Sequence, residues 1–534
     1  MKKKHFIGLL LASVIAASSL FTACGPNSAG NDENTVEVYA YNGGWGLDWL
    51  TAAEKKFEDA NPGIDVVIKQ QDILGGIADQ VKSGPRANSV DLYWASEDIF
   101  ELLLKGSDVL SGYNMVFEPL DEVYDYKPSG DKTVREKCSP GMLDAVTFKT
   151  EENGETVSHE YVLHLGNGSA GIIYNSKKFE ELGITVPRTT DELYDVTCKE
   201  INEKHSDGGN KTKAAFSESV STAYSQYMMY VWWAQYETVE GVKDFWNGKY
   251  TKNGLPKTGN GIFEQKGRLY ALEAYEKMIG DYVGEGEKAY PRNAHSKINS
   301  MKYIQAQEQL MNGNCLMMVN GNWLENEMSL RSNGSASNVE LKMMKAPIIS
   351  KIIEKTNSIK DDETLRKVVS YVDGEGEKPD GVTDEDIAVI RKARQVKYSN
   401  YSGGTFIPAY ATAKENAKKF MKYLCSEEYA QIYFEKTGGN YVSFNRDLTN
   451  FSSASAFMKS VAENEGTTEC PNGYRYPLAG LGGMLVFPGT VDIPSLLAAK
   501  NANDRKTPQA IFDYGVTIGT NEYFRECLEK AGLN

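Results

Sequence analysis

The first part of the chain alternates between strand and helix, and this order constrains the fold more than any other feature of the sequence. Residues 36–41 alternate between apolar and polar side chains, as in a half-buried β-strand, and the pattern breaks at Asn42-Gly43-Gly44. A helix follows over residues 50–57, Asn61-Pro62-Gly63 ends it, and residues 64–68 form the next strand. A helix between two strands predicts a parallel β-α-β unit.

The same alternation continues further along the chain. Residues 90–94 and 171–175 read as strands, and Thr189-Thr190-Asp191-Glu192 is a capping box that starts another helix. Thr412 and Glu415 form a second capping box, at the start of a helix that runs to residue 424. The predicted fold class is therefore α/β.

The N-terminal residues are typical of an export signal. Three lysines precede an apolar run over residues 6–20, and the segment ends at Ala23-Cys24. Ala23-Cys24 resembles the lipobox of bacterial lipoproteins, although Phe21 stands where that motif usually has Leu. The resemblance implies that residues 1–23 are a signal peptide, that Cys24 carries lipid, and that residues 24–34 are a flexible linker. The alternative is ordinary secretion, with Cys24 as a chance residue.

Composition and length narrow the class of protein. The chain has 73 acidic and 58 basic residues and a net charge of −15, which argues against nucleic acid as a partner. Its 534 residues exceed what one core usually holds, so we expect two or more compact bodies. The six cysteines after Cys24 lack metal-ligand spacing, and buried free thiols are favoured over disulfides, whose pairing the sequence leaves open.

Aromatic residues follow several of the predicted strands. In open α/β sheets, ligands gather where strands end. Tyr41-Asn42-Gly43-Gly44-Trp45 and Tyr93-Trp94-Ala95-Ser96-Glu97-Asp98 each place a Trp near a hydrogen-bonding side chain, and Asn320-Gly321-Asn322-Trp323 follows the strand at residues 315–319. Residues 224–236 hold a further cluster of Tyr and Trp. Such sites suit a sugar, whose C–H faces stack on rings; the alternative is that these rings pack in the core.

These landmarks occur in the order typical of one family. They include Glu54-Lys55-Lys56-Phe57-Glu58, Asp91-Leu92-Tyr93-Trp94, Gly171-Ile172-Ile173-Tyr174-Asn175, Leu182-Gly183-Ile184, Met318-Val319-Asn320-Gly321-Asn322-Trp323 and Ile407-Pro408. The chain resembles an extracellular solute-binding protein of the carbohydrate ABC-transporter class, the family that includes maltodextrin-binding proteins. The resemblance implies two α/β lobes joined by crossing strands, with a ligand cleft between them. Lobe 1 would be residues 35–166 plus 401–441, and lobe 2 residues 167–400 plus 442–534.

The resemblance also implies a function and a set of ligand contacts. The protein would be a monomeric, lipid-anchored receptor that captures an oligosaccharide and delivers it to ABC permease subunits, without catalysis, cofactor or metal. Trp94 and Trp323 match the family's stacking residues in lobe 1 and lobe 2. Glu97 matches the family's carboxylate that binds hydroxyl groups, and Asn167 lies at a lobe crossing. The predicted carbohydrate contacts are Asn42, Gly44, Trp45, Trp94, Glu97, Asn167, Tyr227, Trp232, Trp323 and Tyr441.

Two other functions remain open at this point. An anchored glycan hydrolase would use carboxylates such as Glu97 and Asp98, but adjacent residues of an extended segment point to opposite sides. Asn167-Gly168-Ser169-Ala170-Gly171 lacks the first glycine of a nucleophile elbow. The same fold could instead bind a peptide, a polyamine or a metal complex, although the paired Trp sites favour sugar.

Residues 371–385 form an acidic segment with several carboxylates, the ligand type that calcium prefers. They lack the Asp-x-Asp-x-Asp-Gly order of an EF-hand loop. A solvated loop that leads into a helix capped by Thr383 is the favoured interpretation.

Overall fold

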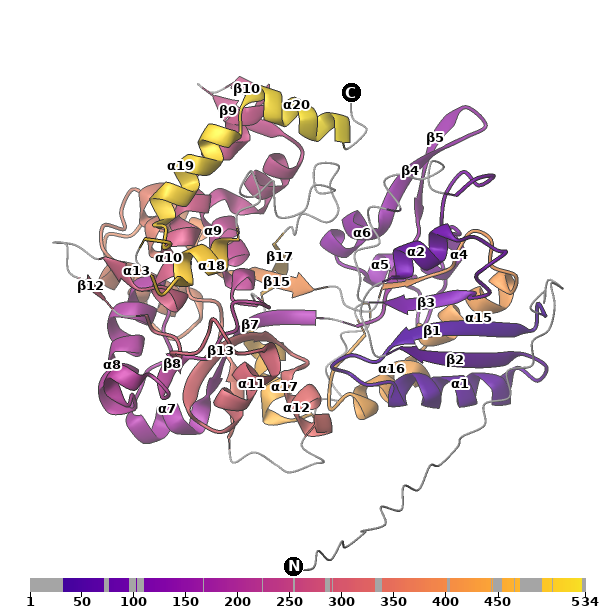
Figure 1. The fold of residues 1–534 in the computed structure, drawn as a ribbon, viewed down its shortest axis with the longest axis horizontal. Coiled ribbons are helices and arrows are strands. Elements are labelled where there is room, and N and C mark those ends of the chain that lie inside the picture. Colours follow the sequence, from indigo (N-terminus) through magenta and orange to yellow (C-terminus); the bar gives the residue numbers. More distant parts are fainter. Residues whose placement is uncertain are drawn as a thin grey trace, which may run out of the picture.

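The chain forms two bodies that lie side by side, each built around its own β-sheet (Figure 1). The computed structural model describes residues 32–530, with the exception of residues 72–75, 96–101, 103–109, 167, 223, 253–254, 284–288, 291, 332–338, 401–403, 443, 445–453, 465, 471–491 and 502. We call the body on the right of Figure 1 lobe 1 and the body on the left lobe 2. Each lobe has its own hydrophobic core, so the predicted two-lobe α/β fold is confirmed.

The sheet of lobe 1 has the strand order β2-β1-β3-β16-β6. Its strands are β1 (Thr35–Tyr41), β2 (Asp65–Gln71), β3 (Leu92–Ala95), β16 (Gly404–Phe406) and β6 (Leu163–His164). Strand β1 is parallel to both β2 and β3, which confirms the predicted β-α-β unit. Strand β16 runs antiparallel to its neighbours β3 and β6. A late segment of the chain thus completes the sheet that the first residues begin.

Helices cover this sheet because their apolar faces need burial. Helix α1 (Asp48–Ala60) connects β1 to β2. Its apolar face lies in the core of lobe 1 and consists of four buried residues, Trp49, Leu50, Ala53 and Phe57. The other helices of lobe 1 are α2 (Ile77–Lys82), α4 (Asp121–Tyr124), α5 (Val134–Lys137), α6 (Pro140–Val146), α15 (Lys414–Leu424) and α16 (Glu427–Lys436). A hairpin of β4 (Thr147–Glu152) and β5 (Glu155–Glu160) projects from the lobe (Figure 1).

The sheet of lobe 2 has the order β17-β15-β7-β13-β8, and β14 also pairs with β7. Its strands are β17 (Thr468–Glu469), β15 (Val396–Asn400), β7 (Gly168–Asn175), β13 (Cys315–Gly321), β8 (Ala214–Phe216) and β14 (Leu341–Met343). Strand β7 is antiparallel to β13, β14 and β15. Strand β13 is buried at every position, in keeping with its unbroken apolar run.

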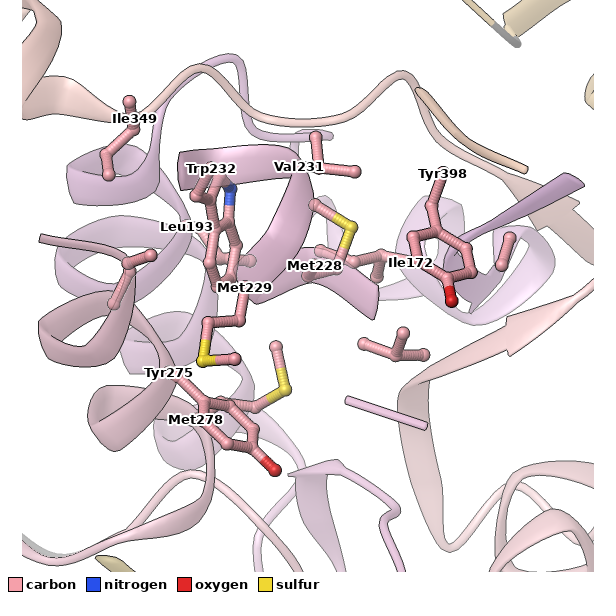
Figure 2. Close-up of a cluster of buried hydrophobic side chains, with 14 of the residues drawn as sticks. Ile172, Leu193, Met228, Met229, Val231, Trp232, Tyr275, Met278, Ile349 and Tyr398 are labelled. Atoms are coloured by element: carbon pink, nitrogen blue, oxygen red, sulfur yellow. The ribbon is translucent and has the colours of Figure 1, made fainter. Parts of the chain in front are cut away.

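Lobe 2 is the more helical body. Its helices are α7 (Ser176–Leu182), α8 (Lys199–Lys204), α9 (Gln226–Trp246), α10 (Lys266–Ile279), α11 (Tyr303–Met311), α12 (Leu324–Arg331), α13 (Asp362–Val372), α14 (Asp384–Arg394), α17 (Ala456–Asn464), α18 (Ile493–Ala498), α19 (Pro508–Ile518) and α20 (Asn521–Lys530). Two short hairpins, β9 (Lys249–Lys252) with β10 (Leu255–Thr258) and β11 (Tyr282–Val283) with β12 (Ala289–Tyr290), complete it. Figure 2 shows part of its core, where side chains of α9 meet Tyr275 and Met278 of α10.

The chain passes between the two sheets at separate places. Strand β6 ends at His164 in lobe 1, and β7 begins at Gly168 in lobe 2; β15 and β16 make the return crossing. Gly166 and Val442 form an antiparallel bridge beside the first crossing. Asn167 and Ser402, which we expect at these crossings, lie outside the described residues.

The predicted helix caps have different outcomes. Thr383 accepts a hydrogen bond from the Asp386 amide at 3.2 Å, as predicted. The predicted capping box of Thr412 and Glu415 is wrong, because α15 starts after Ala413 without a side-chain cap. Asp91 of the neighbouring β3 region accepts from the amides of Thr412 and Ala413 instead, each at 2.9 Å. A buried carboxylate from another segment has replaced the local cap.

The acidic segment at residues 371–385 is held by ion pairs. The pairs are Asp373 with Arg394 at 2.7 Å, Glu375 with Arg188 at 3.2 Å and Asp384 with Lys378 at 2.8 Å. Within the described part of the chain, no group of three or more His, Cys, Asp or Glu side chains could hold a metal ion. Cys138, Cys198, Cys315 and Cys425 are free thiols, and of the six cysteines after Cys24 all except Cys138 are buried.

Candidate functional site

The loop after β1 lies at the carboxyl end of the lobe 1 sheet. The Asn42 amide donates to Gln71 O at 2.8 Å, which continues the β1 to β2 ladder by one residue. The Gly46 amide then donates to Gly43 O at 2.9 Å and closes a tight turn. Within this turn Asn42 is exposed, whereas Trp45 is only 5% exposed. The local sequence therefore presents a polar side chain and a large ring at one strand end.

Trp323 of lobe 2 stands at the corresponding place after β13. It lies in the turn between the buried strand and α12, one residue after Asn322, and it is 9% exposed. A Cβ atom at Gly321 would lie 2.0 Å from the Trp323 ring, so only glycine allows the ring to lie over the backbone there. Tyr224 contacts the ring edge to face, with centroids 6.3 Å apart.

These two strand ends meet at the boundary between the lobes. A Cβ atom at Gly44 would lie 3.3 Å from both Cβ and Cδ1 of Trp323. The side-chain amide of Asn326 donates to the Gly44 carbonyl oxygen at 2.6 Å. The structure thus brings together Gly44 and Trp323, two predicted contact residues that are far apart in the sequence.

Three predicted aromatic residues share an unusual kind of burial. Trp45, Trp323 and Tyr441 are 5%, 9% and 5% exposed, yet none of them belongs to either hydrophobic core. Next to Tyr441, the Asn440 side chain accepts from Asn322 Nδ2 at 3.2 Å and links the residues before Trp323 to the segment near the crossing. The side chains of Trp45, Trp323 and Tyr441 are thus shielded from solvent although they belong to neither hydrophobic core.

Trp94 has a mixed environment. It belongs to the core of lobe 1, and its ring meets Trp49 edge to face with centroids 5.1 Å apart. Its Nε1 atom is buried and has no hydrogen-bond partner among the described residues, which do not include residues 96–101 after β3. In the described structure Trp94 therefore packs as a core residue of lobe 1.

A run of stacked tyrosines lies at the start of α9. Tyr227 stacks on Tyr398 of β15 with centroids 4.3 Å apart, and Tyr224 stacks on Tyr227 at 5.5 Å. Burial raises the pKa of Tyr224 well above its usual range, with smaller effects from Tyr227 and from Tyr41 of lobe 1 among others. Like an ordinary tyrosine, Tyr224 is protonated at neutral pH, and its phenol can donate a hydrogen bond. Tyr398 and Asn326 are absent from the predicted contacts. Aromatic and glycine residues lie near both of them in the sequence, but only the tertiary structure shows which of these neighbours meet.

Trp232 lies elsewhere. It is fully buried in the core of lobe 2, beside Leu193 and Met229 (Figure 2), and its Nε1 donates to Pro347 O at 3.1 Å. We therefore leave Trp232 out of the candidate site. Glu97, Asn167 and Cys24 lie outside the described residues. No helix in the part of the chain that the structure describes has both the length and the apolar character to cross a membrane.

Comparisons with known proteins agree with this architecture. The fold is similar to a structure from work on xylan utilization by the thermophilic bacterium Caldanaerobius polysaccharolyticus, with a TM-score of 0.55, 15% identity, and coverage of 93% of this chain and 99% of that one. It is also similar to the ABC substrate-binding protein Lmo0181 from Listeria monocytogenes in complex with cycloalternan, with a TM-score of 0.54, 14% identity, and coverage of 94% and 100%. At these identities the likeness concerns the fold.

Sequence comparison identifies the family. The diacetylchitobiose binding protein NgcE of Streptomyces coelicolor is 27% identical over 164 residues, which span 30% of this chain and 31% of that protein. Residues 52–465 match the family described as bacterial extracellular solute-binding protein. Because this match covers most of a chain that folds into two α/β lobes, the protein belongs to the bacterial extracellular solute-binding proteins and acts outside the cytoplasm.

Proposed function

We propose that this solute-binding protein captures an oligosaccharide between its two lobes and delivers it to the permease of an ABC transporter. The observation that carries the proposal is that Trp45, Trp323 and Tyr441 are buried although they belong to neither core, and that Trp323 of lobe 2 lies against Gly44 of lobe 1. Rings in such a position offer flat apolar faces to the C–H groups of a sugar as soon as the lobes separate.

Polar groups near these rings complement the hydroxyl groups of a sugar. The phenol of Tyr224, whose ring contacts Trp323, is a donor and an acceptor, and so is the exposed Asn42 amide. Charged side chains are few among these residues. This composition favours a neutral polyhydroxylated ligand over a peptide or a polyamine.

The similar proteins support a carbohydrate ligand. One is named for diacetylchitobiose, one was solved with cycloalternan, and one comes from work on xylan utilization. All three names concern oligomers or polymers of sugars. Two further structures of similar fold, each with a TM-score of 0.52, were solved with α-D-tagatose and with ribitol, so the names favour a carbohydrate ligand without favouring one chain length. The proposal of an oligosaccharide rests on the several aromatic rings at the strand ends, each of which offers a face to one sugar ring.

The proposal includes the arrangement and location of the chain. Lobe 1 comprises residues 35–166 plus 401–441, and lobe 2 the rest after residue 34. The lobes close over the ligand by bending at the crossings, and the protein acts as a monomer without chemical change to the sugar. Lipid on Cys24 holds it at the membrane, and residues 25–34 separate this anchor from the fold.

A binding screen tests the proposed function. Calorimetric titration of the purified protein with diacetylchitobiose, xylo-oligosaccharides and cycloalternan should give saturable binding to at least one of them. Chromatography should recover the bound sugar intact. Recovery of cleaved products would favour the glycan hydrolase instead, and failure to bind any member of a broad oligosaccharide panel would contradict the proposal.

A further inference from the structure

Three glycines in the loop after β1 are required for three different reasons. A Cβ atom at Gly43 would lie 2.7 Å from Tyr41 Cε1, a clash inside lobe 1 itself. Gly46 has a φ of 66°, which L residues adopt only with strain. Gly44 has neither constraint, because its φ lies outside the left-handed region and its nearest neighbours belong to Trp323 of lobe 2. A Cβ atom at position 44 would therefore meet Trp323 of lobe 2 first and disturb the contact between the lobes.

Two residues of lobe 2 converge on this glycine. Trp323 and Asn326 are three positions apart at the start of α12, so they share one face of the chain there. The Trp323 side chain covers the Gly44 backbone, and Asn326 Nδ2 donates to its carbonyl oxygen at 2.6 Å. Both contacts reach backbone atoms, which can approach closely only where no Cβ intervenes.

Two other direct contacts between the lobes differ from the one at Gly44. The buried hydrogen bond between Asn322 and Asn440 lies next to the crossing at Gly166 and Val442, where the chain itself already joins the lobes. The other is an ion pair. Lys243 of α9 and Asp144 of α6 pair at 2.7 Å, but their side chains are 35% and 53% exposed. Solvent screens such a pair, so it contributes little to closure. The partly buried contact at Gly44 is the stronger candidate for holding the lobes together.

We propose that Trp323 and Asn326 form a latch on the Gly44 backbone that stabilises the closed arrangement of the two lobes. Gly44 thereby acts through closure rather than through a ligand contact, and Asn326 acts as a positioning residue. This inference rests on the proposed function, because a more stable closed state raises the affinity for a ligand that is bound between the lobes.

Two variants test the latch. Gly44→Val places methyl groups against Trp323, and we expect it to weaken binding of the best oligosaccharide by about tenfold or more. Asn326→Ala removes one hydrogen bond and should weaken binding by about 3- to 10-fold. In the double variant the losses should not add, since either change alone already breaks the latch. Without ligand, the radius of gyration of Gly44→Val should be at least as large as that of the wild type. With saturating sugar, it should be larger than that of the sugar-bound wild type.

Matched controls separate closure from folding. Gly376→Val adds the same side chain where a Cβ would meet only Ser370 Cβ, at 3.8 Å. Asn464→Ala removes an amide to carbonyl bond of 2.9 Å, to Met343, inside lobe 2. Both controls should keep wild-type affinity, and the melting temperature of the ligand-free Gly44→Val protein should stay within a few degrees of the wild type.

The outcomes of these experiments distinguish a failure of the latch proposal from a failure of the proposed function. If the wild type binds sugar and both latch variants bind it equally well, the latch is wrong and the proposed function stands. Additive losses in the double variant would also overturn the latch, because Asn326 would then act independently of Gly44. If no oligosaccharide binds but Gly44→Val expands the ligand-free protein, the latch is supported and the proposed function fails.

Discussion

The carboxylate of Asp91 accepts a hydrogen bond from the backbone amide of Thr412, 321 positions further along the chain, at 2.9 Å. The same carboxylate accepts from Ala413 N at 2.9 Å and, through its other oxygen, from Glu37 N at 3.1 Å. Asp91 is fully buried and joins β1, the start of β3 and the start of α15. It therefore fastens the returning segment of the chain to the first part of lobe 1.

Loss of this carboxylate should destabilise lobe 1. Asp91→Ala leaves three amides without this acceptor, the buried one of Ala413 and the partly buried ones of Glu37 and Thr412, and we expect the free energy of unfolding to fall by about 2 to 4 kcal/mol. Asp91→Asn keeps one acceptor oxygen and should lose less. Urea denaturation measures both variants, and a loss below about 1 kcal/mol for Asp91→Ala would show that other contacts hold the segment.

Trp323 and Trp232 provide a matched pair of tryptophans. Trp323→Ala should remove about 2 kcal/mol of binding energy, because the ring lies at the lobe boundary outside both cores. Its melting temperature without ligand should stay within a few degrees of the wild type. Trp232→Ala opens a cavity in the core of lobe 2 and should instead cost about 3 to 5 kcal/mol of stability. Calorimetric titration and melting curves distinguish them, and the assignment fails if Trp323→Ala binds sugar as the wild type does.

Glu218 should make the stability of lobe 2 depend on pH. It is 1% exposed, its Oε1 accepts from Val319 N at 2.9 Å, and burial raises its pKa to about 8. Between pH 4.5 and about 8 the native state therefore binds a proton that the unfolded state releases, so the free energy of unfolding falls as pH rises. The loss is on the order of a few kcal/mol at most.

The variant Glu218→Gln keeps the acceptor for Val319 and lacks the titration. Its melting temperature should decline less between pH 5 and pH 8 than that of the wild type. Identical pH profiles for the two proteins would show that Glu218 ionises in the native state without cost.

The proposed anchor depends on Cys24. In the producing cell, Cys24→Ala should move the protein from the membrane fraction to the soluble fraction without a change in sugar affinity, because the linker separates the anchor from the fold. Cys138→Ala is the matched control and should stay with the membrane. Retention of the Cys24 variant at the membrane would argue for another mode of attachment.

The sequence by itself determined the local elements and their order. The alternation in residues 36–41, the helical spacing that ends at Asn61 and the Thr383 cap all depend on neighbours within a few positions, and the structure has each of them. The order of these elements was enough to predict an α/β fold with two lobes. Periodicity and capping are short-range effects, so they can be read along the chain.

Only the tertiary structure decided which residues meet. Thr412 does not cap α15 as predicted. The buried carboxylate of Asp91, which is distant in sequence, accepts hydrogen bonds from the backbone amides of Thr412 and Ala413 instead. Trp232 and Trp323 both look like candidate ring platforms in the sequence, and only packing shows that Trp232 is fully buried in a core whereas Trp323 lies against Gly44. Contacts of this kind depend on how two sheets are placed relative to each other, and no local pattern in the sequence records that placement.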